Sequence, residues 1–356
     1  MRETMQESTP RSILIIRPSA LGDVCRTVPV LSSLRAAWPD ARIDWLVQQE
    51  FTEVVASHPA LDSVVSFPRS RLRGAWRSPS RALRGVRWAS GLRKHGWDLV
   101  LDCQGLARSA LFTRCTGARR RIGFADAREF GWIHYTTRVR TSVTHAVDRM
   151  MSLVDDLGIP RVMDMDLHAS DDAIDWWSSL PDRPAEGYAV FAPRSRWPSK
   201  EWPAKRWVEL AHRSRDLGLQ DLVFVGSPAE SSSIESLASE IMSDPSASSL
   251  RIHVLAGKTT VGQLMAVIRG SRVVVASDSA ALHMAVGFRR PMVALFGPTD
   301  PEEVGPYGCL DSVLRDPSAT GHGHDYRSGA GPAPSMLSLG VDEVFGALSS
   351  RLGVGA

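Results

Sequence analysis

Short apolar runs alternate with amphipathic segments along most of the chain. Residues 13–16 and 273–276 are two such runs, and each precedes a polar loop and a segment with apolar residues three or four positions apart. Runs of this kind are typical of buried strands, and the three- and four-residue steps are typical of helices. Further strands are expected at 43–47, 63–67, 98–102, 188–191, 222–225, 251–254 and 291–296. This alternation predicts an α/β protein with parallel, doubly wound sheets.

The alternation falls into two series. Residues 181–187 read PDRPAEG, a polar stretch with proline and glycine that is typical of a boundary. At 356 residues the chain exceeds what one hydrophobic core usually covers. We therefore expect an N-terminal Rossmann-like domain at 1–180 and a second one at 181–340. An amphipathic helix lies in 341–356, and packing back on the N-terminal domain is one option for it.

A strand, a helix and a second strand are expected within residues 271–302. Asp278 and Ser279 follow the first strand, and His283 lies one turn further along the helix. Ligands of parallel sheets bind beyond the carboxyl ends of the strands, so these three side chains are expected to project toward a ligand. The helix start offers backbone N–H groups and a positive dipole end, which suits a phosphate. A lone histidine here is more often a packed core group than a ligand.

Basic residues gather in one segment, although the formal net charge is only +3. No acidic residue occurs between Asp62 and Asp98. That interval contains Arg69, Arg71, Arg73, Arg77, Arg81, Arg84, Arg87, Arg93 and Lys94. Two interpretations stay open, a solvated helix face rich in arginine and a surface that binds anions. The segment lacks the repeated aromatic residues of single-strand binders, so nucleic acid is not expected as a partner.

Several features of the sequence argue against other classes of protein. The four cysteines include no CxxC pair, and residues 1–11 are polar, so a zinc site, disulfides and a signal sequence are not indicated. No apolar run approaches the ~18 residues of a membrane span, and we expect a cytoplasmic protein. The DxD of residues 164–166 alternates like a strand, and the GHGHD of residues 321–325 suits a polar loop, so no metal site is expected. No GxGxxG follows the first strand and no GxxxxGK[ST] occurs, which disfavours dehydrogenases and P-loop proteins.

Three motifs carry a family resemblance: PSALGDV at 18–24, APRSRWPSKEWP at 192–203 and SDSAALHMAVGFRRPMVALFGPTDP at 277–301. Together they resemble the heptosyltransferases of lipopolysaccharide core assembly, glycosyltransferase family 9, and the resemblance extends over residues 13–352. It implies the GT-B fold, in which two Rossmann-like domains face each other across a cleft. The first holds the acceptor and the second the nucleotide-sugar. It also implies inverting transfer with no cofactor or metal, usually from ADP-L-glycero-D-manno-heptose.

The resemblance implies that Asp23 is the catalytic base. Inverting transfer needs a group that removes the proton of the acceptor hydroxyl while its oxygen attacks the anomeric carbon. Asp23 follows Gly22, which lets the backbone approach a sugar closely. From local sequence alone, Asp23 reads more readily as the N-cap of a helix over 24–37.

Donor-binding residues are implied in the second half. Lys200 matches a lysine that contacts the donor, although a lysine beside Trp197 and Trp202 can also cover apolar rings on the surface. Arg194 and Arg196 are close by in the same loop, and phosphate contacts are expected from Ser195 and Arg196. The other matches are Asp278, Ser279 and the amide of Ala280, Glu230 near the ribose, and, ranked second, His283. Thr299 and Asp300 are equally well explained by an exposed turn.

The acceptor of this family carries carboxylates and often phosphates, so arginines of the first half are its expected contacts. We name Arg69, Arg71, Arg73 and Arg120. The chain departs from the family at GHGHDYRSGAGPAPSM, residues 321–336, where many members have a cysteine-containing segment. This departure leaves the donor base and the acceptor open.

The sequence therefore predicts a cytoplasmic glycosyltransferase, monomeric and in peripheral contact with the inner membrane, that moves a heptose to an anionic lipid-linked saccharide. Alternatives stay open: a related enzyme with another nucleotide-sugar or acceptor, a Rossmann-type oxidoreductase, and a non-catalytic module that binds nucleotide or saccharide.

Overall fold

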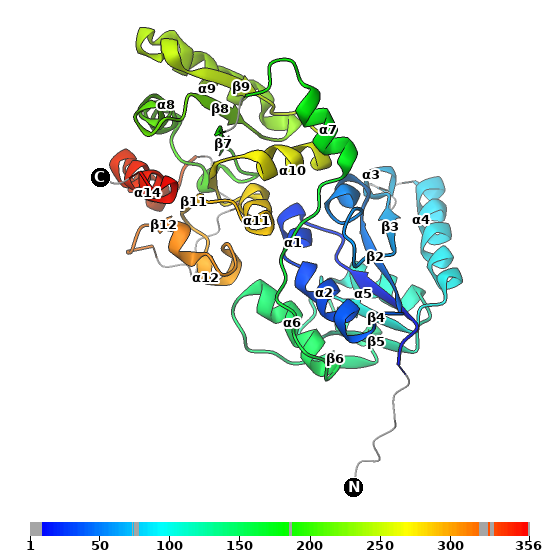
Figure 1. Cartoon of the computed structure of the whole chain (residues 1–356). Coiled ribbons are helices and arrows are strands. Elements are labelled where there is room, and N and C mark those ends of the chain that lie inside the picture. Colours follow the sequence, from blue (N-terminus) through cyan, green and yellow to red (C-terminus); the bar gives the residue numbers. More distant parts are fainter. Residues whose placement is uncertain are drawn as a thin grey trace. The chain divides into compact units, whose positions relative to one another are not determined.

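The computed structural model describes residues 9–72, 74, 78–184, 187–319, 327 and 331–354. It divides the chain into two compact units, Met1–His168 and Ala169–Ala356. Each unit holds one parallel sheet with helices on both faces (Figure 1). The predicted residues Arg73 and Arg77, and the GHGHD segment, lie outside the described residues. None of the described helices is long and apolar enough to cross a membrane.

The sheet of the N-terminal unit has the order β3-β2-β1-β4-β5-β6, with all neighbours parallel. The strand order reverses between β1 and β4, so their carboxyl ends form the switch point where doubly wound sheets bind ligands. The strands are β1 (Ser12–Ile16), β2 (Arg42–Gln48), β3 (Ser63–Phe67), β4 (Leu99–Asp102), β5 (Arg120–Phe124) and β6 (Thr137–Val139). The helices are α1 (Leu21–Cys25), α2 (Val28–Ala37), α3 (Arg69–Leu72), α4 (Pro79–Gly91), α5 (Ala107–Cys115) and α6 (Ala146–Asp156), with 3-10 turns η1 (Gln49–Val54), η3 (Leu92–His95) and η4 (Gly131–His134).

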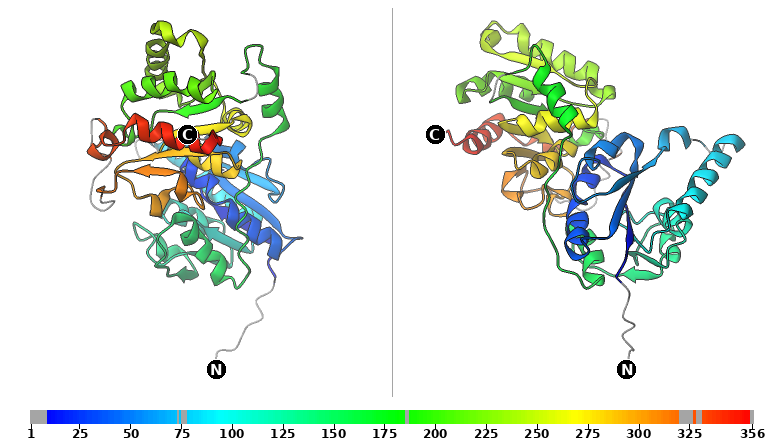
Figure 2. Two further views of the ribbon diagram at one scale, coloured as in Figure 1. Left: turned by 60° about the vertical axis from the view of Figure 1, so that its left-hand side comes forward. Right: turned by 45° about the vertical axis from the view of Figure 1, so that its right-hand side comes forward.

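The sheet of the C-terminal unit has the order β12-β11-β10-β7-β8-β9, also parallel, and its switch point lies between β7 and β10. Figure 2 shows the helix Val341–Leu352, in red, beside this sheet. The strands are β7 (Ala189–Ala192), β8 (Asp221–Phe224), β9 (Arg251–Val254), β10 (Val273–Ser277), β11 (Met292–Phe296) and β12 (Val313–Arg315). The helices are α7 (Asp171–Ser179), α8 (Ala204–Arg213), α9 (Ser231–Ser243), α10 (Val261–Gly270), α11 (Ala280–Gly287), α12 (Pro301–Val304), α13 (Pro334–Leu337) and α14 (Val341–Leu352), with 3-10 turns η5 (Pro198–Lys200), η6 (Ser214–Leu217), η7 (Pro228–Glu230), η8 (Pro245–Ser249) and η9 (Leu310–Ser312).

The central strands of both sheets are apolar because both of their faces are covered. β1 and β10, at the two switch points, are almost fully buried. The core of the C-terminal unit contains Trp202 and Trp207, whose rings meet edge to face with centroids 5.4 Å apart. Burial of such rings contributes strongly to stability, since each removes a large apolar area from water.

The division between the units differs from the expected one. It lies at 168/169 rather than 180/181, because α7 belongs to the C-terminal unit. Trp177 of α7 is buried against Tyr188, with ring centroids 5.5 Å apart, and α7 contacts α10. At the other end, Val344 and Leu348 of α14 join the core of the C-terminal unit. The apolar face of this helix is therefore used within its own unit.

The expected helix over 24–37 is two helices. α1 begins at Leu21, with Ala20 at its N-cap, and α2 begins at Val28, with Pro29 in its first turn. Asp23 is therefore at the third helical position and not at the N-cap. It still serves the helix start, because its carboxylate accepts from the Ala20 N–H at 3.1 Å. Residues 164–166, whose alternation is typical of a strand, form neither strand nor helix.

Candidate active site

Asp23 lies at the switch point of the N-terminal unit. The loop after β1 leads into α1 and places Asp23 beside the loop after β4. Arg17 and Arg26 flank its carboxylate: Arg17 Nη2 is 2.8 Å from Oδ2, and Arg26 Nη2 binds Oδ1. The Asp23 side chain is 22% exposed, whereas those of Arg17 and Arg26 are 12% and 8% exposed. The carboxylate is thus reachable from solvent while its two cations are largely covered.

The two arginines determine the charge state of Asp23. Burial alone opposes ionisation of its carboxyl group, but the Arg17 and Arg26 guanidinium groups together outweigh burial and hold its pKa well below the usual range. Asp23 is therefore an anion at neutral pH. A carboxylate held in this way is a weak base by itself, and it accepts a proton most readily when the donating hydroxyl becomes acidic as its oxygen forms a bond.

A buried carboxyl group, that of Asp102, holds the loop after β4 in place. Asp102, the last residue of β4, is fully buried and accepts from the Tyr135 hydroxyl at 2.7 Å and from the Gln104 N–H at 2.9 Å. Burial raises the pKa of Asp102, against the smaller opposite effect of these donors. The Gln104 side chain accepts from Ser19 N–H at 3.3 Å, and Arg17 donates to the Cys103 carbonyl. The two loops of the switch point are thereby tied together around Asp23.

Two arginines lie at the carboxyl ends of β3 and β4. Arg69, the first residue of α3, is exposed and donates to the Gln48 side chain at 3.1 Å. Arg108, which the sequence analysis did not single out, lies over the Phe67 ring at 5.5 Å. Burial lowers the pKa of Arg108, and the charge of Arg69 lowers it further, so these two cations are neighbours. Their order in the sequence gave no signal, because only the sheet brings them together. Arg71 is also exposed in α3.

Arg120 is a correction to the predicted set. It is the first residue of β5 and pairs with Leu99, the first residue of β4, so it lies at the amino edge of the sheet. Asp23 and Arg69 follow the carboxyl ends of β1 and β3, about 13 Å or more along the strands. The structure therefore does not bring Arg120 together with the other candidate residues of this unit. The run Arg119-Arg120-Arg121 gave a wrong prediction because it lies at the start of a strand and not after the end of one.

Lys200 and Asp278 meet at the switch point of the C-terminal unit. Lys200 ends the short turn η5 after β7, and Asp278 follows β10. Lys200 Nζ donates to Asp278 Oδ2 at 2.7 Å, with side chains 12% and 10% exposed. Thr299 Oγ1 donates to the same oxygen at 2.8 Å. Thr299 is therefore part of this cluster and not a residue of an exposed turn.

The loop after β7 is held by a second set of contacts. The Ser195 hydroxyl donates to the Asp278 carbonyl at 3.2 Å, which links this loop to the loop after β10. Glu201 fixes the loop from the other side, since it accepts from Arg194 Nη1 at 2.9 Å and from Ser195 N–H at 3.2 Å. Arg196 lies over the Trp197 ring at 5.2 Å. These contacts determine the conformation of the loop.

The start of α11 adjoins this cluster. Ser279 is the N-cap of α11, yet its side chain caps no backbone group, and its hydroxyl is buried without a partner among the described residues. The helix start, including the Ala280 N–H, offers donors of the kind that bind phosphate. His283 is 5% exposed within a helix that is buried almost throughout, so the structure favours the packed interpretation of this residue.

Glu230 has a structural role of its own. Its carboxylate accepts from Ser227 N–H at 2.6 Å and caps the turn η7 before α9. A contact between Glu230 and a ribose stays a prediction. Within the described ranges, no three His, Cys, Asp or Glu side chains gather in the manner of a metal site.

Two doubly wound units with loop-borne polar clusters at their switch points have the architecture of GT-B glycosyltransferases. The solved structure of E. coli ADP-heptose lps heptosyltransferase II has this fold, with a TM-score of 0.75 at 23% identity over 96% of this chain and 98% of that chain. The model of glycosyltransferase family 9 (heptosyltransferase) matches residues 86–328. The chain belongs to this family and is a glycosyltransferase.

Individual relatives are similar along most of their length. Lipopolysaccharide heptosyltransferase 1 of Pseudomonas aeruginosa is 32% identical over 83% of this chain and 81% of its own length. Lipopolysaccharide heptosyltransferase 1 of Escherichia coli K12 is 29% identical over 86% and 93%. The solved structure of E. coli heptosyltransferase WaaC with ADP-2-deoxy-2-fluoro heptose aligns with a TM-score of 0.74 at 26% identity over 96% and 99%.

Proposed function

We propose that this protein transfers a heptose from ADP-L-glycero-D-manno-heptose to an anionic, lipid-linked saccharide of the lipopolysaccharide inner core, with Kdo or heptose as the acceptor sugar. The reaction is inverting and needs no metal ion. Support for the donor comes from the WaaC structure with an ADP-heptose analogue, and support for the pathway comes from the lipopolysaccharide heptosyltransferases of P. aeruginosa and E. coli.

The observation that carries the proposal is the ionised carboxylate of Asp23 at the switch point of the N-terminal unit. In the proposed step, the acceptor oxygen bonds to the anomeric carbon while the bond from that carbon to the diphosphate breaks. The hydroxyl proton passes to Asp23. Arg17 and Arg26 hold the carboxylate in place and keep it unprotonated before the step.

The second cluster meets the charge of the leaving group. A departing ADP carries the negative charge that develops in the transition state, and preorganised donors stabilise it. Lys200 is placed for this role if it exchanges the Asp278 carboxylate for a phosphate oxygen, and the N–H groups at the start of α11 add further donors. Asp278, still bound by Thr299, is then available to a sugar hydroxyl.

The arginines of the N-terminal unit suit an anionic acceptor. Arg69 and Arg108 are neighbouring cations at the same edge of the sheet as Asp23, and mutual repulsion between them is relieved when a carboxylate or phosphate binds. Their guanidinium groups match the planar geometry of a Kdo carboxylate.

Peripheral contact with the inner membrane is part of the proposal, together with a cytoplasmic monomer. The helix α4 has no buried residue, and it exposes Leu83 by 50% and Val86 by 64% beside Arg84 and Arg87. Exposed apolar side chains flanked by cations are typical of helices that lie in an anionic membrane surface. A lipid-linked acceptor would be met at that surface.

A donor screen tests the proposal. ADP-, UDP- and GDP-sugars are offered with and without a Kdo-lipid acceptor, in the presence of EDTA, and both nucleotide release and the anomeric configuration of the product are measured. We expect release of ADP only, dependent on acceptor, with inverted configuration. Transfer from another nucleotide-sugar would contradict the donor assignment, and transfer that requires Mg²⁺ in place of EDTA would contradict metal independence. The absence of transfer with every donor, in EDTA and in Mg²⁺, would favour a non-catalytic binding module.

A further inference from the structure

A second basic site lies at the opposite end of the C-terminal sheet from Lys200 and Asp278. A cavity of about 370 Å³ opens where β7, β10 and β11 begin, beside the end of α10 and one side of α7. Four arginines line it: Arg183, Arg269, Arg272 and Arg290. No acidic residue is among the described residues of its wall. We call this cavity the arginine pocket.

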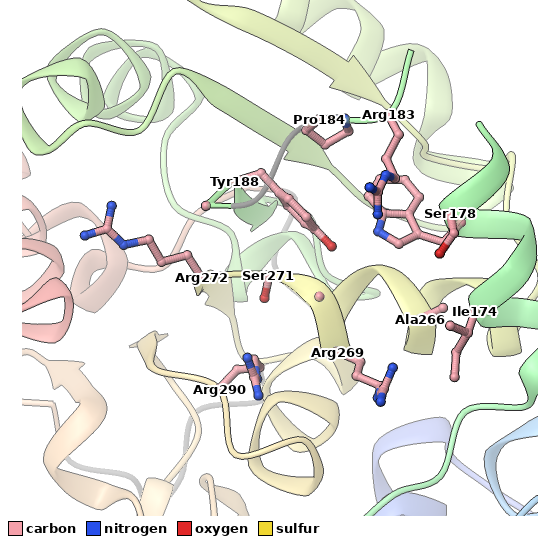
Figure 3. A pocket seen from close by; sticks show the side chains of 13 residues that line it. Ile174, Ser178, Arg183, Pro184, Tyr188, Ala266, Arg269, Ser271, Arg272 and Arg290 are labelled. Carbon is pink, nitrogen blue, oxygen red and sulfur yellow. The ribbon is translucent and has the colours of Figure 1, made fainter. Parts of the chain in front are cut away.

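The arginines come from separate parts of the chain. Arg183 precedes β7, Arg269 is in the last turn of α10, and Arg290 lies between α11 and β11. Figure 3 shows these three around the opening, whereas Arg272 extends away from them. Burial raises the pKa of Tyr188, and the charges of Arg183 and Arg290 have a smaller, opposite effect on it. Both arginines are therefore near the Tyr188 phenol. Three arginines from separate parts of the chain, two of them exposed and Arg290 half-buried, therefore line one cavity.

The convergence is not compensated within the described part of the unit. None of Arg183, Arg269 and Arg290 forms an ion pair with a described carboxylate; the Arg290 guanidinium donates to the Phe288 carbonyl at 3.0 Å. Tyr188, at the floor of the pocket, is 3% exposed and donates to the Val267 carbonyl at 2.6 Å. Arginines that line one cavity and have no counter-ion among the described residues give it a positive potential, which attracts an anion.

We propose that the arginine pocket binds a phosphate group, carried either by a small phosphorylated molecule or by a phospholipid headgroup. A phosphate can accept from guanidinium groups on several sides, so it suits this pocket better than a single carboxylate does. The pocket is also larger than one phosphate needs, and its volume lies within the range of ordinary small-molecule sites. It lies outside the donor cluster, which occupies the carboxyl ends of the same strands.

The test is a calorimetric titration with pyrophosphate on the full chain, with ADP at saturation so that the donor site is occupied. Arg183→Gln, Arg269→Gln and Arg290→Gln are compared with Lys205→Gln, which removes one positive charge from an exposed position on α8. Ser178→Glu places an anion at the exposed rim of the pocket on α7 and leaves the arginines intact. Melting curves check that each variant is folded.

We expect wild type and Lys205→Gln to bind pyrophosphate within about twofold of each other, because a distant charge is screened by salt. Each pocket variant should bind at least about tenfold more weakly. Absence of binding to wild type, or equal affinity in the pocket variants and Lys205→Gln, would overturn the proposal. Sedimentation with phosphatidylcholine vesicles, with and without phosphatidylglycerol, separates the sources. Weaker binding of the pocket variants than of Lys205→Gln to anionic vesicles indicates a headgroup. Unchanged vesicle binding beside weakened pyrophosphate binding indicates a small molecule.

Discussion

Lys200 Nζ and Asp278 Oδ2 are 2.7 Å apart, and the two residues come from loops that follow the two strands at the switch point of the C-terminal sheet. Such a pair is largely covered from solvent and is strengthened by the Thr299 hydroxyl on the same oxygen. In the proposed mechanism the pair is a resting arrangement. When a diphosphate binds, Lys200 pairs with it, and Asp278 becomes available to a hydroxyl of the sugar.

Lys200→Ala should weaken ADP binding at least about tenfold, because a charge-assisted contact to phosphate is lost. Lys200→Arg, which keeps the charge, is the matched control and should bind ADP more tightly than Lys200→Ala. The measurement is a calorimetric titration with ADP. Equal affinity of wild type and Lys200→Ala would show that Lys200 only pairs with Asp278.

The pH profile of transfer tests the charge state of Asp23. Arg17 and Arg26 hold its pKa below the usual range, so the group is ionised at and above the ordinary aspartate pKa of about 3.9. We therefore expect no acidic limb from Asp23 in kcat/KM above about pH 5. Arg26→Gln removes one cation and raises the pKa of Asp23. As the pH is lowered, the activity of this variant should therefore begin to fall at a higher pH than that of wild type.

Arg26→Lys is the control for that profile, since it keeps the positive charge beside Asp23. It should move the acidic limb less than Arg26→Gln does. A limb at the same pH in Arg26→Gln and Arg26→Lys would contradict the assignment of the charge effect to Arg26.

Stability should depend on pH through His58 in the N-terminal unit. His58 is 5% exposed, with its ring 4.8 Å from that of His168. Burial, and then the charge of His168, lower the pKa of His58 from 6.5 to about 4, against the opposite effects of Asp164 and Asp166. The unfolded chain thus binds a proton more readily, and stability is lost as the pH falls from about 6.5 to about 4.

Urea unfolding followed by circular dichroism between pH 7 and pH 4.5 measures this loss, which should amount to about 1 to 3 kcal/mol. His58→Asn cannot titrate, so its midpoint should change less over the same interval. The same pH dependence in wild type and His58→Asn would assign the effect to other groups.

Membrane contact through α4 predicts a specific loss of vesicle binding. Val86→Ser removes an exposed apolar side chain from a basic helix and should weaken binding to vesicles containing phosphatidylglycerol about tenfold. Met242→Ser, a similarly exposed apolar position on α9, is the control and should bind as wild type does. Sedimentation at low and high salt measures both. Equal binding of Val86→Ser and wild type would exclude α4 as the contact.

The strands with continuous apolar runs could be predicted from the sequence because both of their faces are buried, as in β1 and β10. β5 was missed, since it begins with two arginines and contains a glycine, and β12 was missed because it is a short, half-buried edge strand. The break between α1 and α2 follows from Pro29, whose effect the apolar spacing concealed.

The candidate site was predictable only in part. Asp278 and Ser279 could be placed because they directly follow a strand, and Asp23 because its motif carries the resemblance. The pairing of Lys200 with Asp278 depends on which strands are neighbours, which no local pattern encodes. Arg17 and Asp23 both follow β1, and their ion pair depends on the conformation of that loop. The prediction for Arg120 was wrong because it depends on which end of its strand the residue occupies, and Arg120 is at the amino end of β5.

The central claim is that Asp23 accepts the proton of the acceptor hydroxyl. The most direct measurement is the rate of heptose transfer from ADP-L-glycero-D-manno-heptose to a Kdo-lipid acceptor by wild type, Asp23→Asn and, as the control, Asp40→Asn at an exposed position. We predict that Asp23→Asn lowers kcat about 10²- to 10⁴-fold while ADP affinity is retained, and that Asp40→Asn transfers at the wild-type rate. Transfer by Asp23→Asn at the wild-type rate would contradict the account.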